Sequence, residues 1–214
     1  MTAQPTLIDH ASRDDLRVFL ERLQRVGQPE VRLLVRDGTM AVFGCTQAPR
    51  GLTDPLPVVL AVRGFALAAG SSGTDVTVQN RALLARLARM GRTGLELELP
   101  DAQVTAAWAG VLPPFGGWQS SGVLDAASLA EVAEQGMARV AEALPDDPGE
   151  AVVRAVRARV WGAEVAPGVP AAAAFAAETM GFLRDERQVL LARTLTWTRL
   201  STGRGQILVR ALLG

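Results

Sequence analysis

A tight turn at Asp37-Gly38 is the feature that most constrains how this chain can fold. The dipeptide lies between two runs rich in Val, Leu and Phe within residues 31–45. Asp and Gly accept the positive φ angles that a two-residue hairpin turn requires. Residues 31–45 are therefore predicted to form a β-hairpin, and the chain to contain an antiparallel sheet.

Helix and strand signals alternate through the rest of the first half. An opening helix is predicted from Ser12, as its N-cap, to Val26, because apolar residues recur there at helical spacing. Residues 102–112 fit a helix or a strand. The other predicted elements are one strand, or two joined at Gly64, within 56–69, a short strand at 76–78, a helix over 80–90, and a strand over 95–99, where Leu alternates with Glu.

Near residue 123 the composition shifts toward Ala-rich helices. They are predicted over 125–144, 148–161 and 170–183, with Pro in the first turn of the last two. Residues 188–200 and 206–213 are then predicted to pair as a terminal β-hairpin.

These signals predict an α+β fold. It has an antiparallel sheet with an N-terminal helix in the first half, Ala-rich helices in the second half and a C-terminal β-hairpin. Residues 1–122 are the mainly β (α+β) region and residues 123–214 the helical region ending in the hairpin. The two regions form either one compact domain or two domains, since the last hairpin could join the first sheet.

Arginine supplies all the permanent positive charge of the side chains, because the sequence contains no Lys. Its 22 Arg balance 22 acidic residues, so no net field attracts nucleic acid or an acidic membrane. Lysine chemistry is excluded, and so is catalysis by Tyr, which is also absent. A bound anion would meet Arg, whose planar fork suits carboxylates and phosphates.

The residue types that metal and thiol chemistry need are scarce in this sequence. One Cys and one His cannot form a multi-thiolate or histidine-rich metal site, so no metal and no cofactor are expected. Cys45 is predicted to be an inert strand residue, and Glu96 and Glu98 to be a solvated face. No membrane span or signal peptide is recognised, so the expected location is the cytoplasm.

A Gly-rich loop over residues 113–122 is the first candidate for ligand binding. With the preceding Trp108 it offers Phe115, Trp118 and Ser120, which could line a pocket through ring area and hydroxyl hydrogen bonds. The same aromatic residues would serve equally well as packing between the two halves of the chain.

The terminal hairpin is the second candidate. Arg199 and Arg204 flank its Ser-Thr-Gly-Arg-Gly turn and could bind an anion together with backbone N–H groups. Three helices followed by a basic hairpin also resemble a winged helix in outline. The third helix, however, carries no Arg for reading bases, so nucleic-acid binding is disfavoured.

Three functions follow in order of preference. The first is a non-enzymatic cytoplasmic binding or adaptor protein that contacts a protein, including a second copy of itself, or a small molecule. The second is an enzyme acting on an anionic small molecule through arginine clamps. The third is weak nucleic-acid binding through the basic terminal hairpin. Whether the chain is an enzyme is left open by the sequence.

Overall fold

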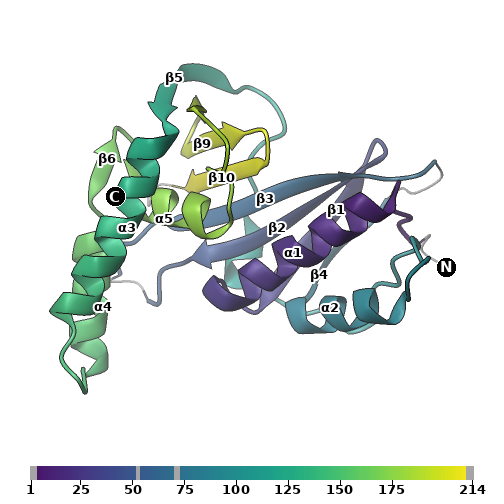
Figure 1. Ribbon diagram of the computed structural model, residues 1–214, viewed down its shortest axis with the longest axis horizontal. Helices are drawn as coiled ribbons and strands as arrows, with labels where there is room; N and C mark the ends of the chain where they lie inside the picture. The colour runs from purple at the N-terminus through teal and green to yellow at the C-terminus, as the bar shows by residue number, and fades with distance from the viewer. Residues whose placement is uncertain (1–3, 52–53, 70–72, 211–214) are drawn as a thin grey trace. The chain divides into compact units, whose positions relative to one another are not determined.

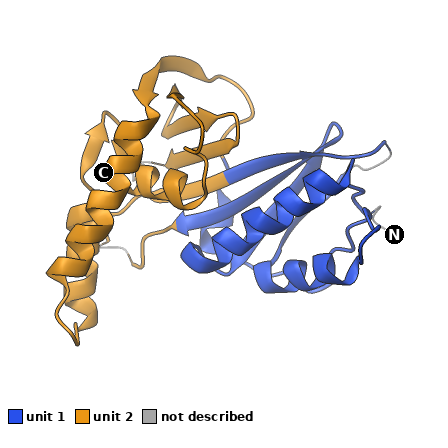
Figure 2. Ribbon diagram, viewed as in Figure 1, with its two compact units in different colours: residues 1–46, 62–112 blue, residues 47–61, 113–214 orange. Residues whose placement is uncertain are grey.

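The computed structural model describes residues 4–51, 54–69 and 73–210. It divides into two compact units, coloured in Figure 2. Unit 1 comprises Met1–Thr46 and Val62–Leu112, and unit 2 comprises Gln47–Ala61 and Pro113–Gly214. Residues 113–122, assigned above to the first region, fall in unit 2, and so does the segment 47–61.

Unit 1 contains a helix-covered antiparallel sheet in the order β4-β1-β2-β3. In Figure 1, α1 runs across these strands. The elements are α1 His10–Val26, β1 Glu30–Arg36, β2 Thr39–Gln47, β3 Val58–Ala66, β4 Asp75–Gln79, α2 Asn80–Arg89 and the short 3-10 helix η1 Ala107–Gly110. Gln47 of β2 and the first four residues of β3 belong to unit 2.

The β1–β2 hairpin confirms the prediction from Asp37-Gly38. Asp37 has φ 50° and Gly38 has φ 74°, so both turn residues are left-handed. Arg36 pairs with Thr39 directly across the turn. Alternate residues of β1 are buried, as expected of a strand with one face on a core.

Helix α1 approaches the hairpin closely at Gly44. A Cβ placed on Gly44 would lie 2.3 Å from Cδ1 of Leu23, a distance that no real side chain could keep. Leu23 is fully buried, so it has no room to yield. Glycine is therefore required in the middle of β2 to seat the helix.

Several predicted boundaries in unit 1 are wrong. Helix α1 begins at His10 with Asp9 as its N-cap, and the Ser12 N–H donates to the Asp9 carboxylate at 2.7 Å. Residues 95–99 form no strand; Glu96 makes only an isolated bridge to Thr6. Of the two alternatives for residues 56–69, the single strand is confirmed as β3. Residues 102–112 hold η1 and a bridge from Gln103 to Val78.

Unit 2 packs three helices on an antiparallel sheet in the order β3-β10-β9-β8-β5. Gly205 of β10 leaves space for the ring of Phe182, which follows α5 in the chain. Its elements are β5 Gln119–Asp125, α3 Ala126–Ala143, α4 Glu150–Trp161, β6 Glu164–Ala166, β7 Val169–Pro170, α5 Ala171–Thr179, β8 Gln188–Thr194, β9 Trp197–Thr202 and β10 Gly205–Arg210.

Small residues allow the helices of unit 2 to approach one another. Six alanines of α5 are buried, and α5 packs against both α3 and α4. Gly136 of α3 lies under Trp161, since a Cβ there would come within 2.4 Å of the indole ring. The Ala-rich composition noted above therefore reflects close helix packing.

The predicted terminal hairpin is confirmed as β9 and β10, and a further strand, β8, precedes it. Residues 188–200 contain two strands, β8 and β9, because Leu195 turns the chain with φ 46°. With β10 they form a three-stranded meander. Helix α5 ends at Thr179, before the predicted Leu183. The α+β class and the arrangement of the predicted element types are nevertheless confirmed.

None of the helices described is long and apolar enough to cross a membrane.

Candidate functional site

One face of the unit 2 sheet brings together three of the six predicted site residues. Ser120 of β5 pairs with Ala192 of β8, and Ala192 pairs with Arg199 of β9. Residues directly opposite one another share a face of a sheet. Trp118 immediately precedes β5 and lies against Arg199. We call Trp118, Ser120, Val123, Leu190, Ala192 and Arg199 the β5–β8–β9 face.

Arg199 is stacked on Trp118. The guanidinium carbon lies 4.4 Å from the ring centroid, and the Trp118 Nε1–H donates to the Pro114 carbonyl at 3.0 Å, which fixes the ring. Burial lowers the pKa of Arg199 from its ordinary value, although a guanidinium remains charged at neutral pH.

The Arg199 guanidinium is also incompletely paired. Its Nε is buried and has no hydrogen-bond partner among the described residues. A dehydrated donor without an acceptor costs free energy. The stack therefore presents a fixed cation that suits a carboxylate or another anionic group.

An exposed apolar pair extends this face. Val123 of β5 is directly opposite Leu190 of β8, and their exposed fractions are 49% and 58%. Leu190 shares its face with Ala192, two residues further along β8. The sequence reasoning missed both residues, because Leu190 lies in a continuous Val-Leu-Leu run whose alternation is hidden. Only the register with β5 shows which of these residues is exposed.

The other three predicted residues lie elsewhere. Trp108 belongs to η1 in unit 1, where it is buried. Phe115 is 71% exposed in the loop before β5. Arg204 is bound within its own neighbourhood, because it donates to the Arg184 carbonyl at 2.9 Å and to Asp185 at 2.8 Å.

The terminal turn already contains an internal acceptor. The Gly203 N–H, which would face an anion in a backbone cradle, donates to the Glu186 carboxylate at 2.8 Å. Three hydrogen bonds thus hold the turn between β9 and β10 against residues 184–186: two from the Arg204 side chain and one from the Gly203 N–H. Arg204 and Arg199 consequently do not act as one clamp in this geometry.

A groove of about 230 Å³ lies on the helix side of β5. Its walls come from β5, α3 and β6, and they are mainly aliphatic. The lining residues are Val123, Leu124, Asp125, Ser128, Leu129, Val132 and Val165.

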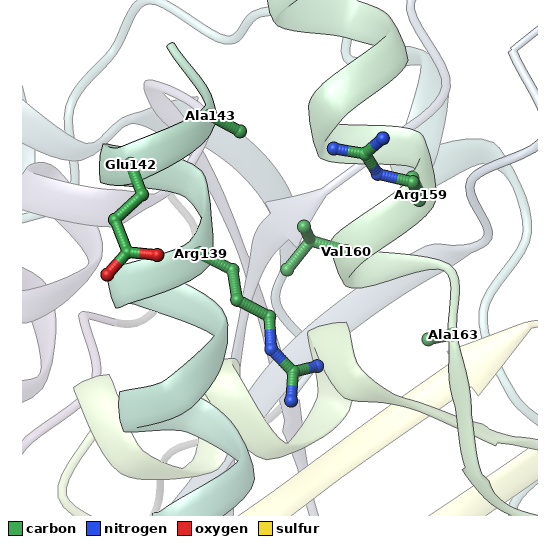
Figure 3. A pocket seen from close by; sticks show the side chains of 6 residues that line it. All are labelled: Arg139, Glu142, Ala143, Arg159, Val160 and Ala163. Carbon is green, nitrogen blue, oxygen red and sulfur yellow. The ribbon is translucent and has the colours of Figure 1, made fainter.

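A second hollow of about 380 Å³ lies between α3 and α4 (Figure 3). Arg139 of α3 and Arg159 of α4 both extend toward it, and Val160 lines its floor. Arg139 donates to Gln135 at 3.3 Å. Within the described part of the chain, Glu142 forms an ion pair with neither arginine. This hollow is cationic and was not foreseen from the sequence.

Metal-binding clusters are not found in the part of the chain that the structure describes. No group of three or more His, Cys, Asp or Glu residues there could hold an ion. Cys45 is fully buried in β2, and His10 is the first residue of α1. Glu96 and Glu98 are exposed, as predicted, and Glu98 pairs with Arg86.

Two family models match the sequence, one after the other. Residues 1–110 match the family described as "Domain of unknown function (DUF8010)", which covers more than half of the 214 residues. Residues 113–213 match "Domain of unknown function (DUF8185)". A sequence comparison with curated proteins finds no match.

Solved structures of bacterial sliding clamps share the fold. The DNA polymerase III subunit beta of Pseudomonas aeruginosa is 14% identical, with a TM-score of 0.56 over 94% of this chain and 64% of that one. The sliding clamp of Caulobacter crescentus is 12% identical, with a TM-score of 0.52 over 99% and 66%. A Bartonella birtlesii clamp bound to griselimycin is 14% identical, with a TM-score of 0.53 over 99% and 65%.

At these identities the likeness concerns the fold alone. The chain spans less than two thirds of the length of each of these clamps.

Proposed function

The chain belongs to the DUF8010 family of domains of unknown function, and we propose that this member is a non-enzymatic, cytoplasmic protein-binding module. Its β5–β8–β9 face contacts the partner. The proposal rests on one observation above all: an exposed aliphatic pair, Val123 and Leu190, lies on the same sheet face as the Trp118–Arg199 stack.

The composition of this face favours a protein partner. Protein interfaces combine a central apolar area with Trp and Arg anchors and a polar rim. Here Val123 and Leu190 supply the apolar area, Trp118 and Arg199 the anchor, and Ser120 a rim hydroxyl. Trp118 and Arg199 are already held in one arrangement, so little side-chain entropy would be lost on binding.

The fold comparison supports the same class of function. Of the Pseudomonas aeruginosa structures, one is titled a DNA polymerase sliding clamp and another a subunit of DNA polymerase III. A fold used as a subunit of an assembly is compatible with an adaptor role for this chain.

Affinity capture from the native cells tests the proposal. The tagged full chain is compared with Val123→Glu and Leu190→Glu, which place a charge on the apolar pair. Val152→Glu is the control, because Val152 has a similar exposed fraction of 45% but lies on α4. We expect the wild type and Val152→Glu to capture the same partner in similar amounts. Either face variant should capture at least tenfold less of it. A partner retained equally by all forms would place the interface elsewhere.

A second function, binding of an anionic small molecule, is favoured by the hollow between α3 and α4. Two guanidinium groups from different helices extend toward one space there, which suits phosphate or carboxylate groups. Equilibrium dialysis with inorganic pyrophosphate should show saturable binding that Arg159→Gln weakens at least fivefold. Arg154→Gln, an exposed arginine of α4 outside the hollow, should leave binding unchanged. Absence of saturable binding to the wild type would reject this function.

A further inference from the structure

Strand β5 forms an open edge of the unit 2 sheet. It is the last strand in the order and pairs with β8 on one side. All its residues except the half-buried Leu124 are exposed, and no described strand pairs with its other side. Edge strands are usually protected by charge, Pro or a bulge. Residues 119–124 contain no charge and no Pro. In the described strand the protective features are a bulge between Ser120 and Gly122 and the charged Asp125 at its end, whose carboxylate accepts the Ser128 N–H.

The bulge divides the edge into two parts. Beyond it, the register from Gly122 to Asp125 is regular, so the backbone there can accept a further strand. Gly122 itself has φ 140°, which Gly tolerates. The edge thus offers a short, regular pairing segment with the Trp118–Arg199 stack at its N-terminal end.

Apolar side chains lie on both faces of residues 122–124, and Asp125 ends the strand as the N-cap of α3. Leu124 points toward the helices, where the 230 Å³ groove also receives Leu129, Val132 and Val165. Val123 lies opposite Leu190 on the other face of the sheet and, at the open edge, also lines the groove. Side chains of an added strand alternate between the two faces, so one set would enter the groove and the other would lie beside Val123.

Charge complementarity predicts one further side chain of the added strand, the one that would lie beside Arg199. The stacked Arg199 carries a buried Nε without an acceptor among the described residues. Among the residues that the structure describes, the neighbours of Arg199 at that end of β5 are Trp118, Ser120 and Ala192, none of which is acidic. A carboxylate on the added strand would pair with the charge of the part-exposed guanidinium.

We infer that β5 binds an extended peptide segment of a partner protein as an added strand. The segment is aliphatic at alternate positions and acidic where it passes Trp118 and Arg199. This inference rests on the proposed protein-binding function and specifies the partner's chemistry. The main-chain pairing provides affinity, and the groove and Arg199 provide selectivity.

Fluorescence anisotropy with a designed probe tests the inference on the full chain. The probe is the fluorescein-labelled peptide Glu-Val-Glu-Val-Ile-Val-Thr, and a matched peptide carries Lys in place of both Glu. Two further peptides carry backbone N-methyl groups, one peptide on the odd-numbered residues and the other on the even-numbered residues. Each therefore lacks the N–H donors along one edge of the strand. We expect saturable binding of the Glu peptide, at least tenfold weaker binding of the Lys peptide, and at least tenfold weaker binding of one methylated form.

Variants of the protein separate the groove from the charge. Val132→Glu should weaken binding of the Glu peptide at least tenfold, whereas Val152→Glu on α4 should not change it. Arg199→Gln should abolish the preference for the Glu peptide over the Lys peptide while leaving the residual binding intact. Thermal unfolding followed by circular dichroism verifies that each variant is folded. If Val132→Glu is unfolded, the result for Arg199→Gln alone tests the inference.

Four outcomes overturn the inference. They are no saturable binding of the Glu peptide, equal binding of the Glu and Lys peptides, undiminished binding of both methylated forms, and wild-type dimerisation that Val123→Glu abolishes in sedimentation velocity. The last would make a second copy of the chain the occupant. If captured partners still depended on Leu190 while no probe bound, the strand geometry would be rejected and the protein-binding function would stand.

Discussion

Asp9 is the residue that most directly links local sequence to stability in unit 1. Its carboxylate accepts the Ser12 N–H, and this backbone hydrogen bond is the main reason that the pKa of Asp9 is lowered from its ordinary value. Folding therefore favours the ionised form. The cap contributes stability above the unfolded-state pKa of about 3.9, and that contribution is lost as the pH falls through the lower folded-state value.

We therefore predict a pH-dependent difference between the wild type and Asp9→Asn. The amide keeps an acceptor for the Ser12 N–H but cannot titrate. The wild type should melt at a higher temperature than Asp9→Asn near neutral pH, and the two curves should converge below about pH 3. Ser12→Ala, measured in parallel, keeps the backbone donor but loses the hydroxyl that also lowers the pKa of Asp9, so it should retain only part of the pH dependence. A difference between wild type and Asp9→Asn that is independent of pH would contradict this role of the carboxylate.

The sequence could predict some of these residues and not others. Asp37-Gly38 was predictable because its turn depends on two adjacent residues. Asp9 and Ser12 are both good N-caps, so local preference does not choose between them. The choice follows from tertiary contacts: Ile8 donates to the Ala66 carbonyl and Leu7 to that of Leu95, which keeps the chain extended up to Asp9.

The candidate site shows the same division. Trp118, Ser120 and Arg199 were recognised from their residue types. Their association with Val123 and Leu190 depends on the register of β5 with β8, and the bulge shifts that register by one residue. A pattern of residues along one strand cannot reveal such a shift.

At the scale of elements, α5 is the central helix of unit 2. Ala176 is fully buried, and the helix packs against α3, α4 and β10. A larger side chain at this position would have to displace packed neighbours, because protein interiors are close to crystal density.

We predict that Ala176→Leu lowers the free energy of unfolding by about 1–3 kcal/mol, the usual cost of overpacking a core. Ala138→Leu, at an exposed position of α3, should change it by less than about 0.5 kcal/mol. Urea unfolding followed by circular dichroism measures both. A stable Ala176→Leu variant with an unchanged midpoint would show that α5 is loosely packed.

The β8–β9 turn explains the main error in the predicted elements. Leu195 adopts φ 46° although it is neither Gly nor Asn, and it is 94% exposed. No Gly, Asn or Pro marks this turn in the sequence, so the sequence predicts one strand where the structure has two. Residues 95–99 show the opposite case. Their Leu–Glu alternation buries Leu97, but the only ladder contact is the bridge from Glu96 to Thr6.

At the scale of the whole molecule, the two units do not coincide with a simple division of the sequence. Unit 2 includes residues 47–61 as well as 113–214. Within it, the first residues of β3 are neighbours of β10, and Leu56 approaches Gly162 after α4. Val58, Val59 and Leu60 are buried.

We predict that residues 113–214 expressed alone do not fold cooperatively. Each buried aliphatic residue of β3 contributes about 1.5–3 kcal/mol, and the loss of three is comparable with the total stability of a domain, about 5–15 kcal/mol. The fragment should lack a sharp thermal transition and dispersed amide resonances. Co-expression with residues 1–112 should restore both. A fragment that melts sharply on its own would show that residues 47–61 are dispensable.

The central claim is that the open edge of β5 and its adjoining face form the protein-binding surface. Hydrogen exchange of the full chain, with and without saturating Glu-Val-Glu-Val-Ile-Val-Thr peptide, tests it most directly. We predict at least tenfold slower exchange at those amides of residues 122–125 that face away from β8, with little change in β1, β2 and α1. Unchanged exchange at residues 122–125, or protection confined to unit 1, would contradict it.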